Sequence, residues 1–326
     1  MGDRPTPPNG AVTLSPTDGT AHERGGRLPR PRRARYRWSD VVVGYAFTSP
    51  SIILMLLLIF VPIGYTLYLS LFDTSLTNPN PIFLGLRGFG RIFQSKDALM
   101  VIRNSFIWTI LVAFFQFVVG LGTALILNRQ FRLRWLGRSI IIIPWVIPGV
   151  VAGMVWRLLY DAQFGFLNTL LARLGITTVH IDWLGLPGLA MFSVVVAAIW
   201  KGFGFSMLMY LAALQTVPPS LYESAQIDGA DGAQQFAFIT VPHIASVIRT
   251  TILLTAIWTF NYFEIIYVMT GGGPIRSTHI APTYIYELAF INFNFGNASR
   301  FAVLSFLLVS ALSVQYIRMI FRREKL

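Results

Sequence analysis

The sequence of 326 residues contains no cysteine, and this absence excludes disulfide bonds, thiolate nucleophiles and cysteine-ligated metal centres. The four histidines are far apart in the chain and lack metal-ligand spacing, so we predict no metal site. Charged residues make up only 12% of the sequence. The apolar runs carry no grouping of acid, base and nucleophile, which argues against a membrane enzyme and predicts no catalytic residues.

Hydrophobic residues, by contrast, are abundant: they form 54% of the chain, and the mean hydropathy is +0.60. A helix needs about 20 mostly apolar residues to cross a bilayer. Six runs are long enough, at residues 43–71, 104–127, 139–159, 189–214, 245–270 and 300–320. We therefore predict an all-α membrane protein with six transmembrane helices.

The positive charge of the chain lies mainly beside these runs. Residues 1–38 are rich in Pro, Gly, Thr and Arg, which predicts a disordered basic tail before a membrane domain of residues 39–326. The apolar run that follows this tail is too long for a twin-arginine signal. The tail, the 128–138 loop and the C-terminus hold 16 Lys and Arg residues, whereas the three opposite loops hold 5. This asymmetry predicts cytoplasmic termini and a cytoplasmic 215–244 loop, and it explains the net charge of +12 without nucleic acid.

The 215–244 loop is acidic and contains no Lys or Arg. After a Pro-Pro pair, Ser220 is predicted to be an N-cap and Glu223 to complete a capping box. Gly229 is the expected left-handed stop. The pattern predicts an isolated helix over Leu221–Asp228, which is too short to be stable alone in water. We therefore expect a partner protein to hold it.

The same loop resembles the coupling loop of permeases from binding-protein-dependent ABC importers. That loop has the form Glu-Ala-Ala, three residues, Gly, nine residues, Ile, one residue, Leu-Pro. The matching positions here are Glu223, Ala225, Gly229, Ile239 and Pro242, with Ser224 and Val241 as small departures. The resemblance implies that a coupling helix docks on an ATPase subunit through Glu223, Ala225, Asp228 and Gly229. A capped helix with no partner would leave the match at five fixed spacings unexplained.

Two further stretches resemble the sugar subgroup of these permeases, and the resemblance covers residues 40–326. They are Pro144-Trp145-Val146-Ile147-Pro148-Gly149 and Thr270-Gly271-Gly272-Gly273-Pro274, the latter followed by Tyr284-Ile285-Tyr286. The three consecutive glycines lack the Lys-Ser/Thr ending of a phosphate-binding loop. The chain is therefore expected to bind no cofactor itself and to depend on ATP-Mg bound by partner ATPase subunits.

The resemblance implies a type I ABC importer permease fold in a bacterial plasma (inner) membrane, with the chain as a non-catalytic, multi-pass subunit. The implied partners are a second homologous permease subunit in a heterodimer, two ATPase subunits, an extracytoplasmic solute-binding protein and a carbohydrate substrate. The alternative is a secondary transporter or channel for a small polar solute. Such a protein needs coupling-ion residues or internal repeats, and Glu264 is the only carboxylate that we place inside a span.

Carbohydrate permeases hold the solute halfway through the membrane, on the spans that flank the coupling loop. The resemblance to maltose permeases implies these substrate-path residues: Lys201, Gly202, Phe205, Phe260, Asn261 and Glu264. Glu264 is expected one helical turn from Asn261, on the same face. A charge such as Lys201 near the centre of a span costs about 2.5 to 3.5 kcal/mol, so it is expected to face protein or water. Lys201 is expected either to contact the solute or to form a salt bridge, with Glu264 or with the partner permease. A direct Lys201–Glu264 pair would be strained, because Glu264 lies nearer the outer surface.

Overall fold

The computed structural model describes residues 38–76, 78–177 and 179–323. The predicted disordered tail, apart from Trp38, lies outside the described residues. The chain divides into two units, residues 1–56 and 57–326. In the first unit the described residues form the helix α1 (Trp38–Met55), which contains Pro50.

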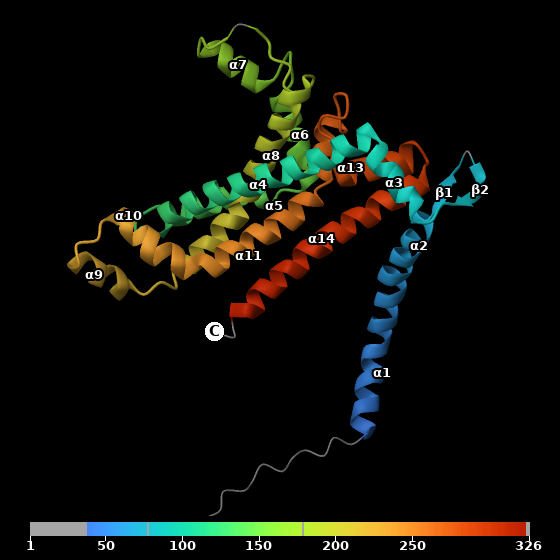
Figure 1. Ribbon diagram of the computed structural model, residues 1–326. Coiled ribbons are helices and arrows are strands. Elements are labelled where there is room, and N and C mark those ends of the chain that lie inside the picture. Colours follow the sequence, from blue (N-terminus) through green and yellow to red (C-terminus); the bar gives the residue numbers. More distant parts are fainter. Residues whose placement is uncertain (1–37, 77, 178, 324–326) are drawn as a thin grey trace, which may run out of the picture. The chain divides into compact units, whose positions relative to one another are not determined.

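Helices dominate the second unit (Figure 1). In chain order the elements after α1 are η1 (Leu56–Phe60, a π-helical turn), α2 (Val61–Ser70), β1 (Phe72–Ser75), β2 (Asn78–Phe83), α3 (Arg87–Gln94), α4 (Lys96–Asn128), α5 (Arg134–Val146), α6 (Gly149–Leu159), α7 (Phe166–Arg173), α8 (Pro187–Leu214), α9 (Pro219–Ile227), α10 (Gly232–Gln235), η2 (Phe236–Thr240), α11 (Val241–Phe260), α12 (Glu264–Thr270), α13 (Ala281–Tyr286), η3 (Glu287–Ile291) and α14 (Phe295–Arg323).

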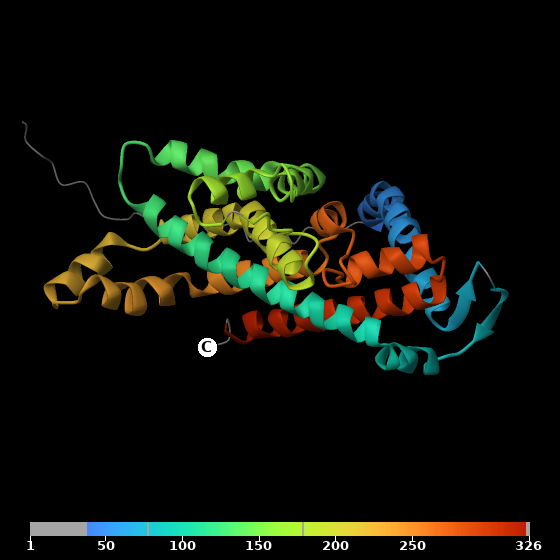
Figure 2. The same cartoon turned by 90° about the horizontal axis from the view of Figure 1, so that it is seen from above.

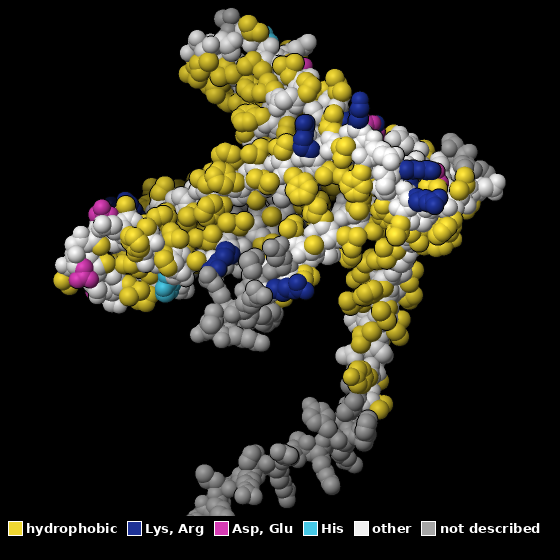
Figure 3. Space-filling model, in the orientation of Figure 1, with side chains coloured by type: hydrophobic (Ala, Val, Ile, Leu, Met, Phe, Trp, Pro, Cys, Tyr) yellow, Lys and Arg dark blue, Asp and Glu magenta, His cyan; other side chains and the backbone are white. Residues whose placement is uncertain are grey.

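Within the described part of the chain, five helical stretches are long and apolar enough to cross a bilayer. They are Tyr45–Ser70, Lys96–Asn128, Pro187–Leu214, Gly232–Phe260 and Phe295–Arg318. The pair α5 and α6 adds a sixth if it is counted as one span, although the two helices meet at 98°. Hydrophobic side chains cover much of the face seen in Figure 3, as expected for a surface that meets lipid.

Two of the predicted spans, 139–159 and 245–270, are not continuous helices. The first breaks at Pro148, because a proline has no backbone N–H and its predecessor Ile147 is extended, with φ −60° and ψ 133°. The second breaks after Phe260, and a new helix starts only at Glu264. The fifth predicted span is therefore present, but its helix ends at Phe260 instead of residue 270.

The core of the second unit lies where α4 packs along α8, with α11 against both (Figures 1 and 2). One hydrophobic cluster gathers around Trp108, Val194 and Ile265. A second gathers around Met207 and Tyr210. Because both clusters join α4 to α8, these two helices form a rigid support for side chains that project between them.

A small antiparallel hairpin of β1 and β2 was not predicted from the sequence. Phe72 pairs with Phe83 across it. The hairpin is tied to α14 by Arg300, which is 1% exposed and donates to the backbone oxygens of Ser70 at 3.0 Å and Phe72 at 2.7 Å. A buried guanidinium with several donors can satisfy the last carbonyls of a helix and the first of a strand together.

Candidate functional site

The predicted coupling helix is present as α9, but it begins earlier than expected. The N-cap is Pro218, in an extended conformation and with no side-chain cap, and Pro219 is the first helical residue. A proline suits the first helical position, because the N–H that it lacks would have no partner within the helix and because its φ is already helical. The prediction that Ser220 caps the helix was therefore wrong, and Glu223 no longer occupies the third position that a capping box requires.

The end of α9 is as predicted. Gly229 adopts a φ of +83°, which a residue with a side chain rarely adopts. The Ala230 amide donates to the Ala225 carbonyl at 2.8 Å, closing the helix end. The chain then starts α10 with a capping box that the sequence analysis missed, in which Asp231 and Gln234 exchange hydrogen bonds of 2.7 and 2.9 Å. The signal for it was the spacing of an Asp and a Gln three residues apart.

The Tyr222 side chain joins α9 to the rest of the unit. The Tyr222 hydroxyl and the Thr240 Oγ1 lie 2.9 Å apart, and the Tyr222 ring packs against the second core cluster. On the other side Glu223 and Asp228 are exposed, and the Ile227 side chain is 87% exposed. Figure 3 shows acidic side chains at this end of the molecule. The exposed Ile227 and the carboxylates beside it are therefore accessible to a partner protein.

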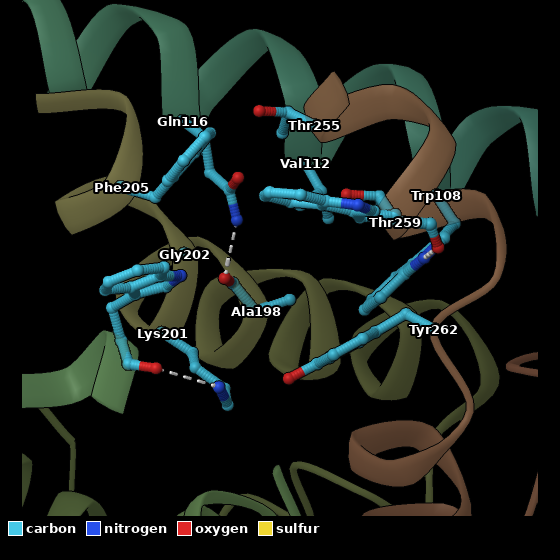
Figure 4. Close-up of a pocket in the computed structure, with 12 residues that line it drawn as sticks. Trp108, Val112, Gln116, Ala198, Lys201, Gly202, Phe205, Thr255, Thr259 and Tyr262 are labelled. Carbon is cyan, nitrogen blue, oxygen red and sulfur yellow. Dashed lines mark hydrogen bonds between the residues drawn. The ribbon is translucent and has the colours of Figure 1, made fainter. Parts of the chain in front are cut away.

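A cavity of about 100 Å³ lies between α4, α5, α8 and α11, near the midpoint of α8 (Figure 4). Its lining consists mainly of aromatic, hydroxyl and amide side chains, with one charged residue. The lining residues are Trp108, Val112, Gln116, Trp145, Ala198, Lys201, Gly202, Phe205, Thr255, Trp258, Thr259 and Tyr262. This lining, with ring faces beside a few hydrogen-bonding groups, has the composition of a site for a small polar solute.

Aromatic rings form two opposed groups in this cavity. Phe205 lies between Trp145 and Trp258, with ring centroids 5.7 and 4.9 Å away. Trp108 stacks on Tyr262 with 15° between the ring planes. The Trp108 indole also donates to the Thr259 carbonyl at 2.9 Å, at the end of α11. This bond fixes the point where α11 stops and thereby positions Tyr262 at the cavity.

The polar side chains of the cavity are held by hydrogen bonds to neighbouring helices. The Gln116 amide donates to the Ala198 carbonyl at 2.9 Å. A Cβ atom on Gly202 would overlap the Gln116 amide, so a glycine is required there for Gln116 to reach the cavity. The Lys201 amine donates to the Trp145 carbonyl at 3.4 Å. The cavity therefore presents an amide, an ammonium group and hydroxyls beside ring faces.

The structure divides the predicted substrate-path residues. Lys201, Gly202 and Phe205 line the cavity, whereas Phe260 and Asn261 line a separate, mainly apolar groove of about 580 Å³ against α13 and α14. Asn261 is the residue that ends α11, and its side chain donates to the Ile257 carbonyl at 2.9 Å.

Glu264 lines neither the cavity nor the groove. It starts α12 and lies against Gly149, the first residue of α6. The expectation that Asn261 and Glu264 share one helical face was wrong, because the helix is broken between them. Solute contact by Phe260, Asn261 and Glu264 stays a prediction.

The cavity residues from α4 were missed because they are far from the coupling loop in sequence. Trp108, Val112 and Gln116 are four residues apart and thus lie on one face of a helix. A glutamine inside a long apolar run is the signal that would have found this face, since polar groups within a span are costly unless they are used. In the part of the chain that the structure describes, no three His, Asp or Glu residues come together as a metal-binding group.

Comparison with protein families gives a match over residues 116–325 to the family described as "Binding-protein-dependent transport system inner membrane component". Among known relatives, the trehalose/maltose transport system permease protein MalF of Thermococcus litoralis is 33% identical over 299 residues. That alignment covers 89% of this chain and 98% of the relative. The sulfoquinovosyl glycerol transport system permease protein SmoG of Agrobacterium fabrum is 33% identical, and that alignment covers 87% of this chain and 93% of the relative.

Among solved structures, a chain of a bacterial ABC transporter involved in the import of the acidic polysaccharide alginate superimposes with a TM-score of 0.75. The two chains are 24% identical, and the match covers 87% of this chain and 98% of the other. The fold described above is thus similar to the fold of that transporter chain.

Proposed function

This chain belongs to the family of binding-protein-dependent transport system inner membrane components, and from that premise we propose that it lines the translocation path of an ATP-driven carbohydrate importer. As a permease subunit it spans the membrane several times and works in a multi-subunit transporter. The observation that carries the carbohydrate assignment is the cavity beside Phe205, where ring faces lie next to an amide and hydroxyls. Sugars present the same combination of apolar faces and hydroxyl edges. Two relatives are named as transport proteins for trehalose/maltose and for sulfoquinovosyl glycerol, and these names support a carbohydrate as the solute.

In this proposal the chain binds no ATP and catalyses no reaction. Two ATPase subunits bind ATP-Mg, a second permease completes the path, and an extracytoplasmic binding protein delivers the solute. The α9 surface with Glu223, Ala225, Asp228 and Gly229 is the docking site of an ATPase subunit. Its exposed carboxylates and the exposed Ile227 support this role, because both gain a partner on docking.

Both termini and α9 are proposed to be cytoplasmic. Since the chain has no cysteine, single cysteines report topology cleanly. With an impermeant maleimide, Thr177→Cys and Asn292→Cys are expected to react in intact cells, and Gln130→Cys and Gln226→Cys only after lysis. Labelling of residue 226 from outside would refute the proposed orientation.

Transport is tested in proteoliposomes that contain the complete transporter and its binding protein. We expect ATP-dependent uptake of at least one carbohydrate from a labelled panel of neutral and acidic sugars. Phe205→Ala and Trp258→Ala are expected to raise the apparent KM for that sugar about fivefold, because each removes a ring face worth about 1 kcal/mol.

Phe192→Ala is the matched control. Phe192 lies on the same helix, α8, but it is exposed and does not line the cavity. Uptake unchanged in both cavity variants, or no uptake of any carbohydrate, would refute the proposed function.

A further inference from the structure

Lys201 is the charged residue of the cavity, and its position calls for a negative partner. It lies in the middle of α8, a helix that is long and apolar enough to cross the membrane, and it is half-buried. A cation in the middle of a span is costly unless it meets an opposite charge, water or a function. No carboxylate of the described residues forms an ion pair with it.

The single hydrogen bond of Lys201 does not account for the charge. Its amine donates to the Trp145 carbonyl at 3.4 Å, a long contact to one of the last carbonyls of α5. An ammonium group has three protons to donate. A neutral donor such as glutamine would be sufficient for this bond.

Glu264 is the carboxylate that attracts Lys201, but the two side chains form no ion pair. It is near enough to attract Lys201 electrostatically, but it lies against Gly149, the first residue of α6. The N-terminus of a helix stabilises a negative charge. Glu264 lies beside this helix end and forms no ion pair with Lys201, so the Lys201 amine keeps free donors.

These donors are directed toward the place where a solute would lie. In Figure 4 the Lys201 amine and the Tyr262 hydroxyl point toward the same open part of the cavity, and the Gln116 amide lies across from them. Phe205 lies one helical turn from Lys201 on α8, so a sugar ring against Phe205 places its substituents near the amine.

We propose that the solute is an anionic carbohydrate whose carboxylate, sulfonate or phosphate is bound by Lys201. This inference rests on the proposed function, because it names the class of carbohydrate within the proposed path. A charge-assisted hydrogen bond in a site of low dielectric discriminates strongly between an anionic sugar and its neutral counterpart.

The test uses the complete transporter with its binding protein in proteoliposomes. Glucose is compared with glucuronic acid, sulfoquinovose and glucose 6-phosphate, and maltose with the corresponding uronic acid disaccharide, so that the panel separates the three anions. We expect uptake of at least one anionic sugar to exceed that of its neutral counterpart at least tenfold. Equal uptake of both members of every pair, or uptake of neutral sugars alone, overturns the inference but leaves carbohydrate transport intact. No uptake of any carbohydrate would instead refute the proposed function.

Variants of Lys201 separate charge from structure. Lys201→Gln keeps a donor for the Trp145 carbonyl but has no charge, and it is expected to reduce uptake of the anionic sugar at least tenfold. Lys201→Arg keeps the charge and is expected to restore most of that uptake. Phe192→Ala on the same helix is the control. Wild-type uptake of the anionic sugar by Lys201→Gln, or equal loss of neutral and anionic sugar uptake in that variant while it co-purifies with the ATPase subunits, would show that the charge does not bind the solute.

Discussion

Residues 215–244 and residues 271–300 are both segments in which helices are short and broken, yet they use their charges differently. In the first segment Glu223, Asp228 and Asp231 are exposed, and none of them is in an ion pair in the described structure. In the second, the charged side chains bind one another and the neighbouring helices.

The contacts of the 271–300 segment form a connected network. Arg276 binds Asp97 at the start of α4 at 2.6 Å and Glu287 at 3.0 Å. Glu287 also contacts the His279 ring at 2.8 Å. Arg300 joins the same end of the chain to the hairpin. Such a network ties the segment together and to α4 and the hairpin.

The difference shows which segment has its charged side chains paired inside this protein and which segment presents them to a partner. The charges of the 271–300 segment are paired within the segment and with α4, so we expect it to keep its structure without another protein. The 215–244 segment has outward-facing carboxylates outside any ion pair of the described structure, and the Tyr222 ring joins its helix α9 to the second core cluster, so we expect α9 to gain stability from docking. Four predictions test this contrast, from the largest expected effect to the smallest.

Gly229→Val is expected to reduce uptake more than tenfold while the protein still inserts into the membrane. A valine at a φ of +83° costs about 1 to 2 kcal/mol or more, which α9 cannot recover from its few contacts. Uptake is measured with the level of membrane-inserted protein by immunoblot. The matched control is Gly232→Ala, since Gly232 has open space around it and no positive φ. Normal uptake in Gly229→Val would mean that α9 tolerates distortion and that coupling occurs elsewhere.

Arg276→Met is expected to lower the free energy of unfolding by about 1.5 to 3 kcal/mol, because it removes charged hydrogen bonds to Asp97 and Glu287. The midpoint of thermal unfolding in detergent measures this. Arg91→Met is the comparison, because the Arg91–Asp73 pair is longer, at 3.4 Å, and exposed. It is expected to cost about 0.5 kcal/mol or less. Equal effects of the two variants would contradict a special role for the network.

Tyr222→Phe is expected to weaken the attachment of α9 about fivefold, since it removes one hydrogen bond worth about 1 kcal/mol. Hydrogen exchange of the α9 amides should become faster by this factor in the free permease. Binding of the ATPase subunits should largely reverse the change. Ser224→Ala, on the same helix but exposed, serves as the control. Unchanged exchange in Tyr222→Phe would show that packing of the ring, and not the hydroxyl, holds the helix.

The last prediction concerns pH. Burial lowers the pKa of His279 below its ordinary value, although the Glu287 carboxylate opposes this shift. The unfolded chain therefore takes up a proton below about pH 6.5 while the folded chain does not, so the stabilisation is complete above that pH and is lost as the pH falls. The unfolding midpoint is expected to drop between pH 7.5 and 5.5. His279→Gln should flatten this profile, and His180→Gln, at an exposed position, should not. A flat wild-type profile would contradict the prediction.

Local signals in the sequence predicted the coupling segment well. The prediction for Gly229 was correct, because a left-handed position needs glycine. The predicted start of α9 was two residues too late, because the helix begins at the proline pair and not after the serine that follows it. The cavity could be predicted only in part. Lys201 and Gly202 follow each other in one span, but Trp108 reaches the cavity from α4 through a bond to Thr259, 151 residues away. No spacing along the chain reveals such a contact.

The cavity also gives the protein an optical property. Three of the eight tryptophans line it, and they differ in surroundings: Trp108 is fully buried, whereas Trp145 and Trp258 are partly exposed. A solute that displaces water from the exposed indoles changes the emission of those two and leaves Trp108 nearly constant. Replacing Trp145 and Trp258 by phenylalanine, one at a time, would identify the responding indole. The native chain therefore carries its own fluorescent reporter for occupancy of the path, with no need for an attached dye.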